Sequence, residues 1–164
     1  MDTVKPKVYL ETSIISYLTA RLSRDLITAA NQQITQKWWE NESANYTLFV
    51  SELVVLEASA GDAQMVQKRL EALQTTTLIK PSEEAEMLTE NIIQRKLLPE
   101  KASADAAHIA IATVHGVDFL LTWNFKHIAN ARIFPKVFEV CVSNGYKPPV
   151  ICTPSELLGE GYEG

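Results

Sequence analysis

A short apolar run near the start of the sequence ends on a carboxylate and leads directly into a helix signal. Residues 8–10 (Val-Tyr-Leu) are strand formers without polar alternation, which is typical of a strand covered on both faces. Glu11 follows this run, and Thr12 or Ser13 can cap the next helix. In open parallel α/β sheets, ligands bind outside the carboxyl ends of the strands. We therefore expect Glu11 to lie at a functional edge of the sheet.

Apolar strand-like stretches and longer stretches with helical spacing alternate along the rest of the chain. Strands separated by helices imply right-handed crossovers and a parallel sheet. The predicted fold class is therefore α/β, with a parallel sheet between two helical layers. Strands are expected at 8–10, 46–50, 76–79, 117–122 and 150–152, and helices at 14–18, 23–41, 52–60, 62–73, 81–98, 101–115, 125–128 and 134–144.

The composition is that of an ordinary globular domain. The chain has 164 residues, 46% of them hydrophobic and 21% charged, which is enough for one substantial core. We expect a single domain over residues 1–158 and a flexible C-terminal tail over 159–164. No apolar run approaches the roughly 20 residues of a membrane span, and the N-terminus lacks the apolar segment of a signal peptide. A cytoplasmic protein without membrane contact is expected.

Charge and cysteine content limit the classes of function. A net charge of −5 argues against non-specific binding of nucleic acid through a large basic surface, but a nuclease built on carboxylates remains compatible with it. Cys141 and Cys152 form no metal-binding pattern with each other or with histidines, so buried free thiols are favoured over a disulfide or a zinc site.

Three acids occupy positions that a soluble surface does not require. Glu11 ends the first strand, Glu57 follows the second strand among apolar residues, and Asp105 opens an alanine-rich helix. Each alone is explained as a partly exposed acid or a helix-end charge favoured by the helix dipole. Together they would meet at one edge of a parallel sheet and repel each other unless a cation lay among them. Oxygen ligands without Cys or His select Mg²⁺ or Mn²⁺.

These segments carry a resemblance to a known family. Residues 8–13 (Val-Tyr-Leu-Glu-Thr-Ser), 50–57, and above all 103–112 followed by 117–124 resemble a PIN domain. The likeness is greatest to the VapC-like toxin branch, and it extends over nearly the whole chain in order and spacing. It implies a three-layer PIN-like fold and a Mg²⁺- or Mn²⁺-dependent endoribonuclease, the toxin of a type II toxin–antitoxin pair. The implied partners are an RNA substrate, an antitoxin protein and a second copy in a homodimer.

The resemblance also assigns roles to individual residues. The implied metal ligands are Glu11, Glu57 and Asp105, which together with Asn124 make up the implied catalytic set. The hydroxyl positions that support metal or water in the family match Ser13 and Thr122.

Two departures from the family pattern leave alternatives open. Glu11 stands where the family usually has Asp, and Asn124 stands where it has a fourth acid. A catalytically weak or inactive PIN-like module that binds RNA or a protein is therefore the main alternative. A phosphorylated receiver domain is the second, and it is disfavoured because Glu11 is a poor phosphoacceptor.

Five further residues have competing interpretations. His108 is favoured as a hydrogen-bonded packing residue over a general base. Lys126 and His127 either reach phosphate or form an exposed helix end, with neither interpretation preferred. Arg21 and Arg24 either touch the RNA backbone or belong to a solvated face.

Overall fold

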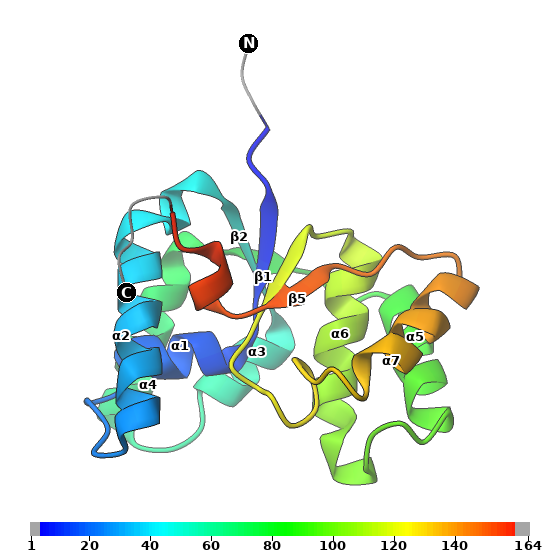
Figure 1. Cartoon of the computed structure of the whole chain (residues 1–164), viewed down its shortest axis with the longest axis horizontal. Helices are drawn as coiled ribbons and strands as arrows, with labels where there is room; N and C mark the ends of the chain where they lie inside the picture. Colours follow the sequence, from blue (N-terminus) through cyan, green and yellow to red (C-terminus); the bar gives the residue numbers. More distant parts are fainter. Residues whose placement is uncertain (1–3, 160–164) are drawn as a thin grey trace.

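In the computed structural model, which describes residues 4–159, five strands form one parallel sheet (Figure 1). The strands are β1 (Lys7–Leu10), β2 (Thr47–Ser51), β3 (Thr77–Ile79), β4 (Phe119–Leu121) and β5 (Val150–Cys152). They lie in the order β3-β2-β1-β4-β5, and every neighbouring pair is parallel. The predicted α/β class is confirmed.

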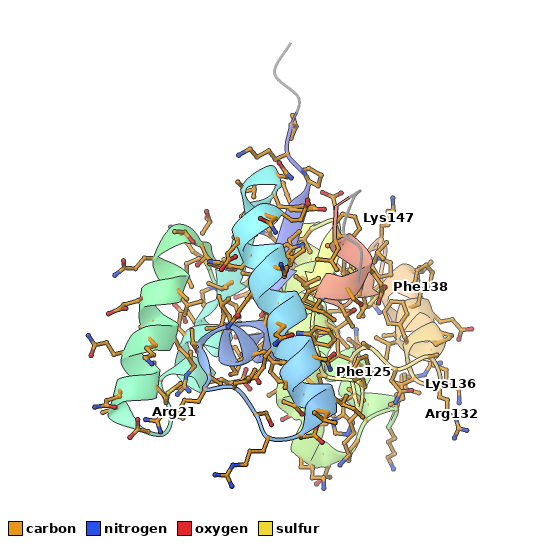
Figure 2. All side chains as sticks on the ribbon, turned by 60° about the vertical axis from the view of Figure 1, so that its left-hand side comes forward. Arg21, Phe125, Arg132, Lys136, Phe138 and Lys147 are labelled. Atoms are coloured by element: carbon orange, nitrogen blue, oxygen red, sulfur yellow. The ribbon has the colours of Figure 1, made fainter. Side chains whose placement is uncertain are left out.

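Helices cover both faces of the sheet, which confirms the three-layer arrangement. The α-helices are α1 (Thr12–Thr19), α2 (Leu26–Asn41), α3 (Glu52–Ala58), α4 (Ala63–Ala72), α5 (Glu83–Gln94), α6 (Ser103–His115) and α7 (Phe134–Ser143). Short 3-10 helices span Ser43–Asn45, Leu73–Thr75, Glu100–Ala102 and Pro154–Leu157. In Figure 1, α1, α2 and α4 lie to the left of the strands and α5, α6 and α7 to the right. Figure 2 brings the first of these layers forward.

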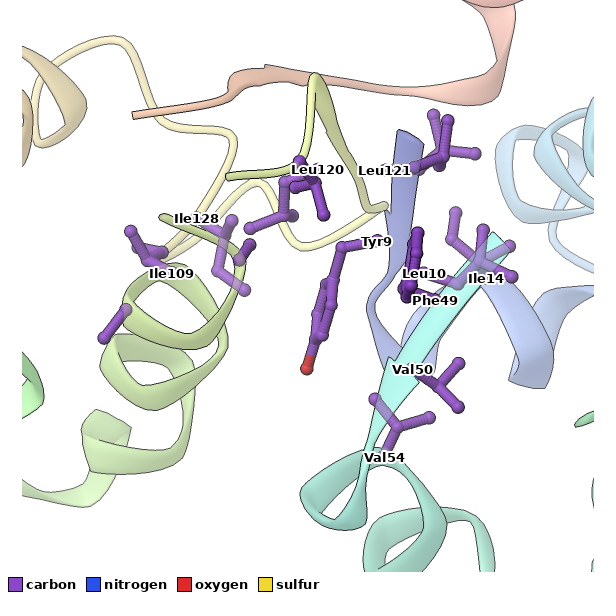
Figure 3. Close-up of a cluster of buried hydrophobic side chains, with 14 of the residues drawn as sticks. Tyr9, Leu10, Ile14, Phe49, Val50, Val54, Ile109, Leu120, Leu121 and Ile128 are labelled. Carbon is purple, nitrogen blue, oxygen red and sulfur yellow. The ribbon is translucent and has the colours of Figure 1, made fainter. Parts of the chain in front are cut away.

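The central strand β1 is the most buried part of the sheet. Val8, Tyr9 and Leu10 are fully buried, because helices pack on both faces and a strand pairs on each side. In Figure 3, the Tyr9 ring extends from β1 toward the α6 layer, with Leu120 and Ile109 nearby. This environment agrees with the unbroken apolar run, which predicted a strand covered on both faces.

The order of the strands creates a switch point between β1 and β4. From β1 the chain winds outward to β2 and β3 on one side, whereas β4 continues to β5 on the other. Helices therefore leave the two central strands toward opposite faces, and the carboxyl ends of these strands border a crevice. Glu11 directly follows β1, and Thr122 directly follows β4. The backbone N–H of Glu11 donates to the carbonyl of Leu121, which holds the two strand ends together.

Three sequence predictions about secondary structure were wrong. Residues 125–128 form hydrogen-bonded turns and no α-helix, because the Asn124 carbonyl accepts from both Ile128 and Ala129 and the pattern stops there. Helix α5 ends at Gln94 and does not reach Leu98, since Lys96 takes a left-handed backbone conformation (φ 55°). The N-cap of α1 is Glu11, and neither Thr12 nor Ser13.

Several other expectations can be compared with the described residues. Cys141 and Cys152 are buried free thiols, as predicted. Among residues 4–159, no helix is long and apolar enough to cross a membrane. The single-domain boundary at residue 158 stays a prediction, and all of the predicted flexible tail beyond Gly159 lies outside the described residues.

Candidate active site

The carboxylate of Glu11 is buried and held by three donors. It is 5% exposed. Its Oε1 accepts from the hydroxyls of Ser13 and Thr122, each at 2.6 Å, and its Oε2 accepts from the Ser13 backbone N–H at 3.1 Å. Such bonds compensate the cost of burying a charge and fix the side chain in one position. Glu11 therefore presents a preorganised anion at the switch point.

Ser13 and Thr122 contribute by fixing Glu11 and the backbone that follows β4. The Ser13 hydroxyl accepts from the Trp123 N–H at 2.8 Å, and the Thr122 hydroxyl accepts from the Asn124 N–H at 2.9 Å. Each hydroxyl thus donates to Glu11 while accepting from the loop after β4. Their implied contact with metal or water stays a prediction.

Glu57 reaches the same region from helix α3. Its Oε1 accepts from the Thr12 hydroxyl and interacts with Nε2 of His108, both at 2.6 Å. Burial raises the pKa of the Glu57 carboxyl, but the contacts with His108 and Thr12 together outweigh burial, so the pKa lies below its ordinary value. Both donors bind Oε1, which leaves Oε2 without a donor from residues 4–159.

A buried hydrogen-bonded chain orients His108 toward Glu57. The Tyr9 hydroxyl lies 2.8 Å from the Ser51 hydroxyl and 2.7 Å from Nδ1 of His108. Burial raises the pKa of the Tyr9 phenol, and the charges of the two nearby glutamates raise it further, so the phenol stays protonated. With a neutral imidazole, the consistent arrangement is Ser51 donating to Tyr9, Tyr9 to Nδ1 and the Nε2–H to Glu57.

Asp105 forms a second carboxylate centre on helix α6, three residues before His108. Its Oδ1 accepts from the Asn124 side-chain amide at 3.1 Å, and its Oδ2 lies 2.8 Å from Nδ1 of His127. The Asn124 amide oxygen accepts in turn from the His127 N–H at 3.0 Å. Asn124 therefore orients Asp105, and His127 is tied to the same carboxylate rather than projecting freely from the surface.

The structure brings some of the predicted ligands closer together than others. Ligand atoms of Glu11, Glu57 and His108 all lie within 4.8 Å of one another, and within the described chain Asp105 is not part of that group. Asp105 and His108 share one face of α6 by their i, i+3 spacing. Metal ligation by Glu11, Glu57 and Asp105 stays a prediction.

The donor atoms fit a hard divalent cation. The available atoms are carboxylate oxygens, and within the described part of the chain Oε2 of Glu57 accepts from no donor. His108 has a suitable distance, but its Nε2 proton is engaged by Glu57, so its lone pair is not available to a metal. Carboxylate oxygens without thiolates suit Mg²⁺ or Mn²⁺. A cation would also reduce the repulsion between the two glutamates.

Three residues of this site were missed from the sequence. Tyr9 and Thr12 were assigned to the strand and the helix cap, and Ser51 caps α3 by accepting from the Val54 N–H. The available signal for Tyr9 was a hydroxyl in an otherwise apolar buried strand, since such a group must find a partner. The expectation that His108 is a hydrogen-bonded packing residue agrees with its full burial and two contacts.

Comparison with known proteins supports the fold. No protein-family model matches the sequence, and no curated protein matches it. Among solved structures, a chain in the crystal structure of VapBC2 from Rickettsia felis, bound to a DNA fragment from their promoter, matches with a TM-score of 0.58 and 16% identity. The match covers 89% of this chain and 97% of that chain.

The chain has a PIN-like fold of the VapC type. The match agrees with the resemblance found in the sequence, and its coverage includes the greater part of both chains. At this identity the likeness establishes the PIN-like fold alone. The activity, metal and partners of this chain must be inferred from the chemistry of its site.

Proposed function

We propose that this chain is a metal-dependent endoribonuclease that hydrolyses RNA phosphodiester bonds with water. The observation that carries the proposal is the convergence of Glu11 and Glu57 at the switch point of the PIN-like sheet. Asp105 lies on the neighbouring helix α6 and completes the proposed ligand set. Asn124 is proposed as the residue that keeps Asp105 in place, through their hydrogen bond of 3.1 Å.

The side chains of the site have distinct tasks in this proposal. Glu11 and Glu57 hold Mg²⁺ or Mn²⁺ through oxygen atoms, with Asp105 as the third ligand. When bound, such a cation lowers the pKa of water and offsets negative charge on the reacting phosphate. Ser13 and Thr122 keep Glu11 in position, while Thr12 and His108 keep Glu57 in position. Ordered carboxylates need little rearrangement when the cation binds.

The biological context is proposed from the VapC-type fold. The solved structure that matches this chain contains VapBC2 and promoter DNA. We extend this to a toxin of a type II toxin–antitoxin pair, acting in the cytoplasm as a homodimer and inhibited by an antitoxin protein. Co-expression with the product of a neighbouring gene, followed by size-exclusion chromatography, tests this extension. Failure to isolate any complex with that product would contradict it.

The cleavage assay uses purified protein and single-stranded RNA in Mn²⁺ or in EDTA. We expect cleavage only with the metal, and a loss of about 100-fold or more in Glu57→Gln and Asp105→Asn. Glu52→Gln is the matched control, because Glu52 is an exposed acid on the same helix as Glu57. Cleavage that persists in EDTA, or equal loss in the control, would contradict the proposal.

The alternative is a PIN-like module that binds RNA or protein without cutting. Asn124 favours this alternative, because it stands where the family pattern has an acid and so leaves the site one negative charge fewer to hold a cation. Retained RNA binding by a wild-type protein that does not cleave in Mn²⁺ would select this alternative.

A further inference from the structure

The segment between Asp118 and Glu156 has a charge opposite to that of the rest of the chain. It contains Lys126, Arg132, Lys136 and Lys147 but only one acid, Glu139. Its net charge is therefore +3, which leaves −8 for the rest of the chain, since the whole chain carries −5. A positive region on an acidic protein attracts an anionic partner to one place.

The cations of this segment are exposed and unpaired. Lys126, Arg132 and Lys136 are all exposed. Between residues 4 and 159, the only two ion pairs join histidines to carboxylates, so none of these three cations is neutralised by a carboxylate. Figure 2 shows Arg132 and Lys136 on the right of the molecule, with Phe125 closer to its centre and Arg21 at the lower left.

An exposed aromatic ring directly follows a residue of the candidate active site. Phe125 is 54% exposed and directly follows Asn124, which binds Asp105. Its ring meets the edge of the buried Trp123 ring, with centroids 6.1 Å apart, and Trp123 stacks on Tyr17 at 5.9 Å. The supported ring leaves more than half of its side chain open, as a platform for base stacking requires.

Hydrogen bonds order the loop between β4 and α7, which carries Phe125, Lys126 and Arg132. The Asn124 carbonyl accepts from the Ala129 N–H at 2.8 Å, while Asn130 accepts from Arg132 through its side chain and from Phe134 through its carbonyl, each at 2.9 Å. Groups on an ordered loop lose less conformational entropy when a ligand binds than groups on a mobile loop.

We propose that single-stranded RNA binds beside the cleavage site, on a post-β4 surface formed by Phe125, Lys126, Arg132 and Lys136. Phe125 stacks on a base, and the three cations contact phosphates of the same strand. The proposal rests on the proposed ribonuclease function, because it assigns the path of that enzyme's substrate. The unpaired cations complement the charge of the phosphates, and the open ring offers an apolar face to a base.

Binding is tested without cleavage, in EDTA, by fluorescence anisotropy of a labelled single-stranded RNA of about 12 nucleotides at several salt concentrations. We expect Phe125→Ala to weaken binding by about fivefold or more, the value for one lost base stack. The double variant Arg132→Ala/Lys136→Ala should reduce the slope of log affinity against log salt by about 1.4, or about 0.7 for each lost phosphate contact.

Matched controls come from exposed residues outside the post-β4 surface. Phe138 is 43% exposed and shares α7 with Lys136, but residues two positions apart on a helix do not face each other. Lys37 and Lys68 are exposed cations on α2 and α4. Phe138→Ala and Lys37→Ala/Lys68→Ala should bind RNA within about twofold of wild type, because surface substitutions outside a contact have small effects. Equal weakening in the controls, or none in the post-β4 variants, would overturn the proposal.

The outcome separates this surface from the proposed function. If wild type cleaves RNA in Mn²⁺ and the post-β4 variants keep wild-type RNA affinity, the proposed RNA-binding surface is wrong and the proposed ribonuclease function is unaffected. Loss of affinity in those variants, with no cleavage by wild type, would support the surface and contradict the enzyme. Absence of RNA binding by wild type would overturn the surface and direct attention to a protein partner.

Discussion

Tyr9→Phe removes one buried hydroxyl and retains the ring, so it probes the hydrogen-bonded chain behind Glu57 without opening a large cavity. Tyr9 is fully buried, and its hydroxyl contacts both Ser51 and Nδ1 of His108. A buried hydrogen bond contributes about 1 kcal/mol, and an acceptor left without a donor costs about 1–3 kcal/mol. His108 is fully buried, so water cannot readily replace the lost donor.

We therefore expect Tyr9→Phe to lower the free energy of unfolding by about 2–3 kcal/mol, because it leaves Nδ1 of His108 unsatisfied. At about 2–4 °C per kcal/mol for a chain of this size, the melting temperature should fall by about 5–10 °C. Urea unfolding followed by far-ultraviolet circular dichroism measures the free energy, and calorimetry measures the melting temperature.

Tyr46→Phe is the control, since Tyr46 packs against Trp38 and Phe119 and its hydroxyl makes no hydrogen bond within residues 4–159. Its free energy of unfolding should change by no more than about 0.5 kcal/mol. Equal stability of Tyr9→Phe and wild type would refute the hydrogen-bonded chain and, with it, the orientation assigned to His108.

Three further predictions follow from the same contacts. The pKa of Glu57 is lowered in the folded state, so the ionised carboxylate stabilises the fold fully above its unfolded pKa, and this stabilisation is lost as pH falls through its folded pKa. Urea melts between about pH 5 and pH 3 should therefore show a weaker pH dependence of stability in Glu57→Gln than in wild type. Identical profiles would contradict this. Asn124→Asp places a carboxylate against that of Asp105, so the free energy of unfolding of this variant in EDTA should fall by about 1–3 kcal/mol and recover in part with Mn²⁺. An equal loss in both solutions would show that a bound metal does not interact with residue 124. Burial raises the pKa of the Cys141 thiol and raises that of Cys152 to about 12, so both should react with a thiol reagent at pH 8 only after unfolding in denaturant, and rapid reaction of the native protein would refute their burial.

The layered fold was predictable because the relevant signals are local. The apolar run at residues 8–10 and the stretch at 117–122 have the composition of covered strands, and Gly116 supplies the left-handed residue that ends α6 (φ 75°). Residues 125–128 were assigned wrongly because their apolar spacing resembles a helix. Their backbone N–H groups instead bond to the carbonyl and side-chain oxygens of Asn124, and the spacing of apolar residues does not reveal these contacts.

The proximity of Glu11 and Glu57 was predictable from the sequence, but the hydrogen bonds of these two acids were not. The position of an acid after a strand follows from the sequence, whereas the partner of each carboxylate depends on how α3 and α6 pack against β1. His108 reaches Glu57 across 51 positions of sequence, and Tyr9 reaches His108 across 99. Contacts of this kind arise from tertiary packing and leave no spacing pattern in a single sequence.

A crystal of the protein soaked in Mn²⁺ and measured at a wavelength where manganese scatters anomalously tests the central claim most directly. The account predicts one anomalous peak at the carboxyl ends of β1 and β4, with oxygens of Glu11, Glu57 and Asp105 roughly 2.0–2.6 Å away. In a crystal of Glu57→Gln, the peak should be weaker or lost. A peak at a different place, or full occupancy without contact to Glu11 and Glu57, would contradict the proposed metal centre.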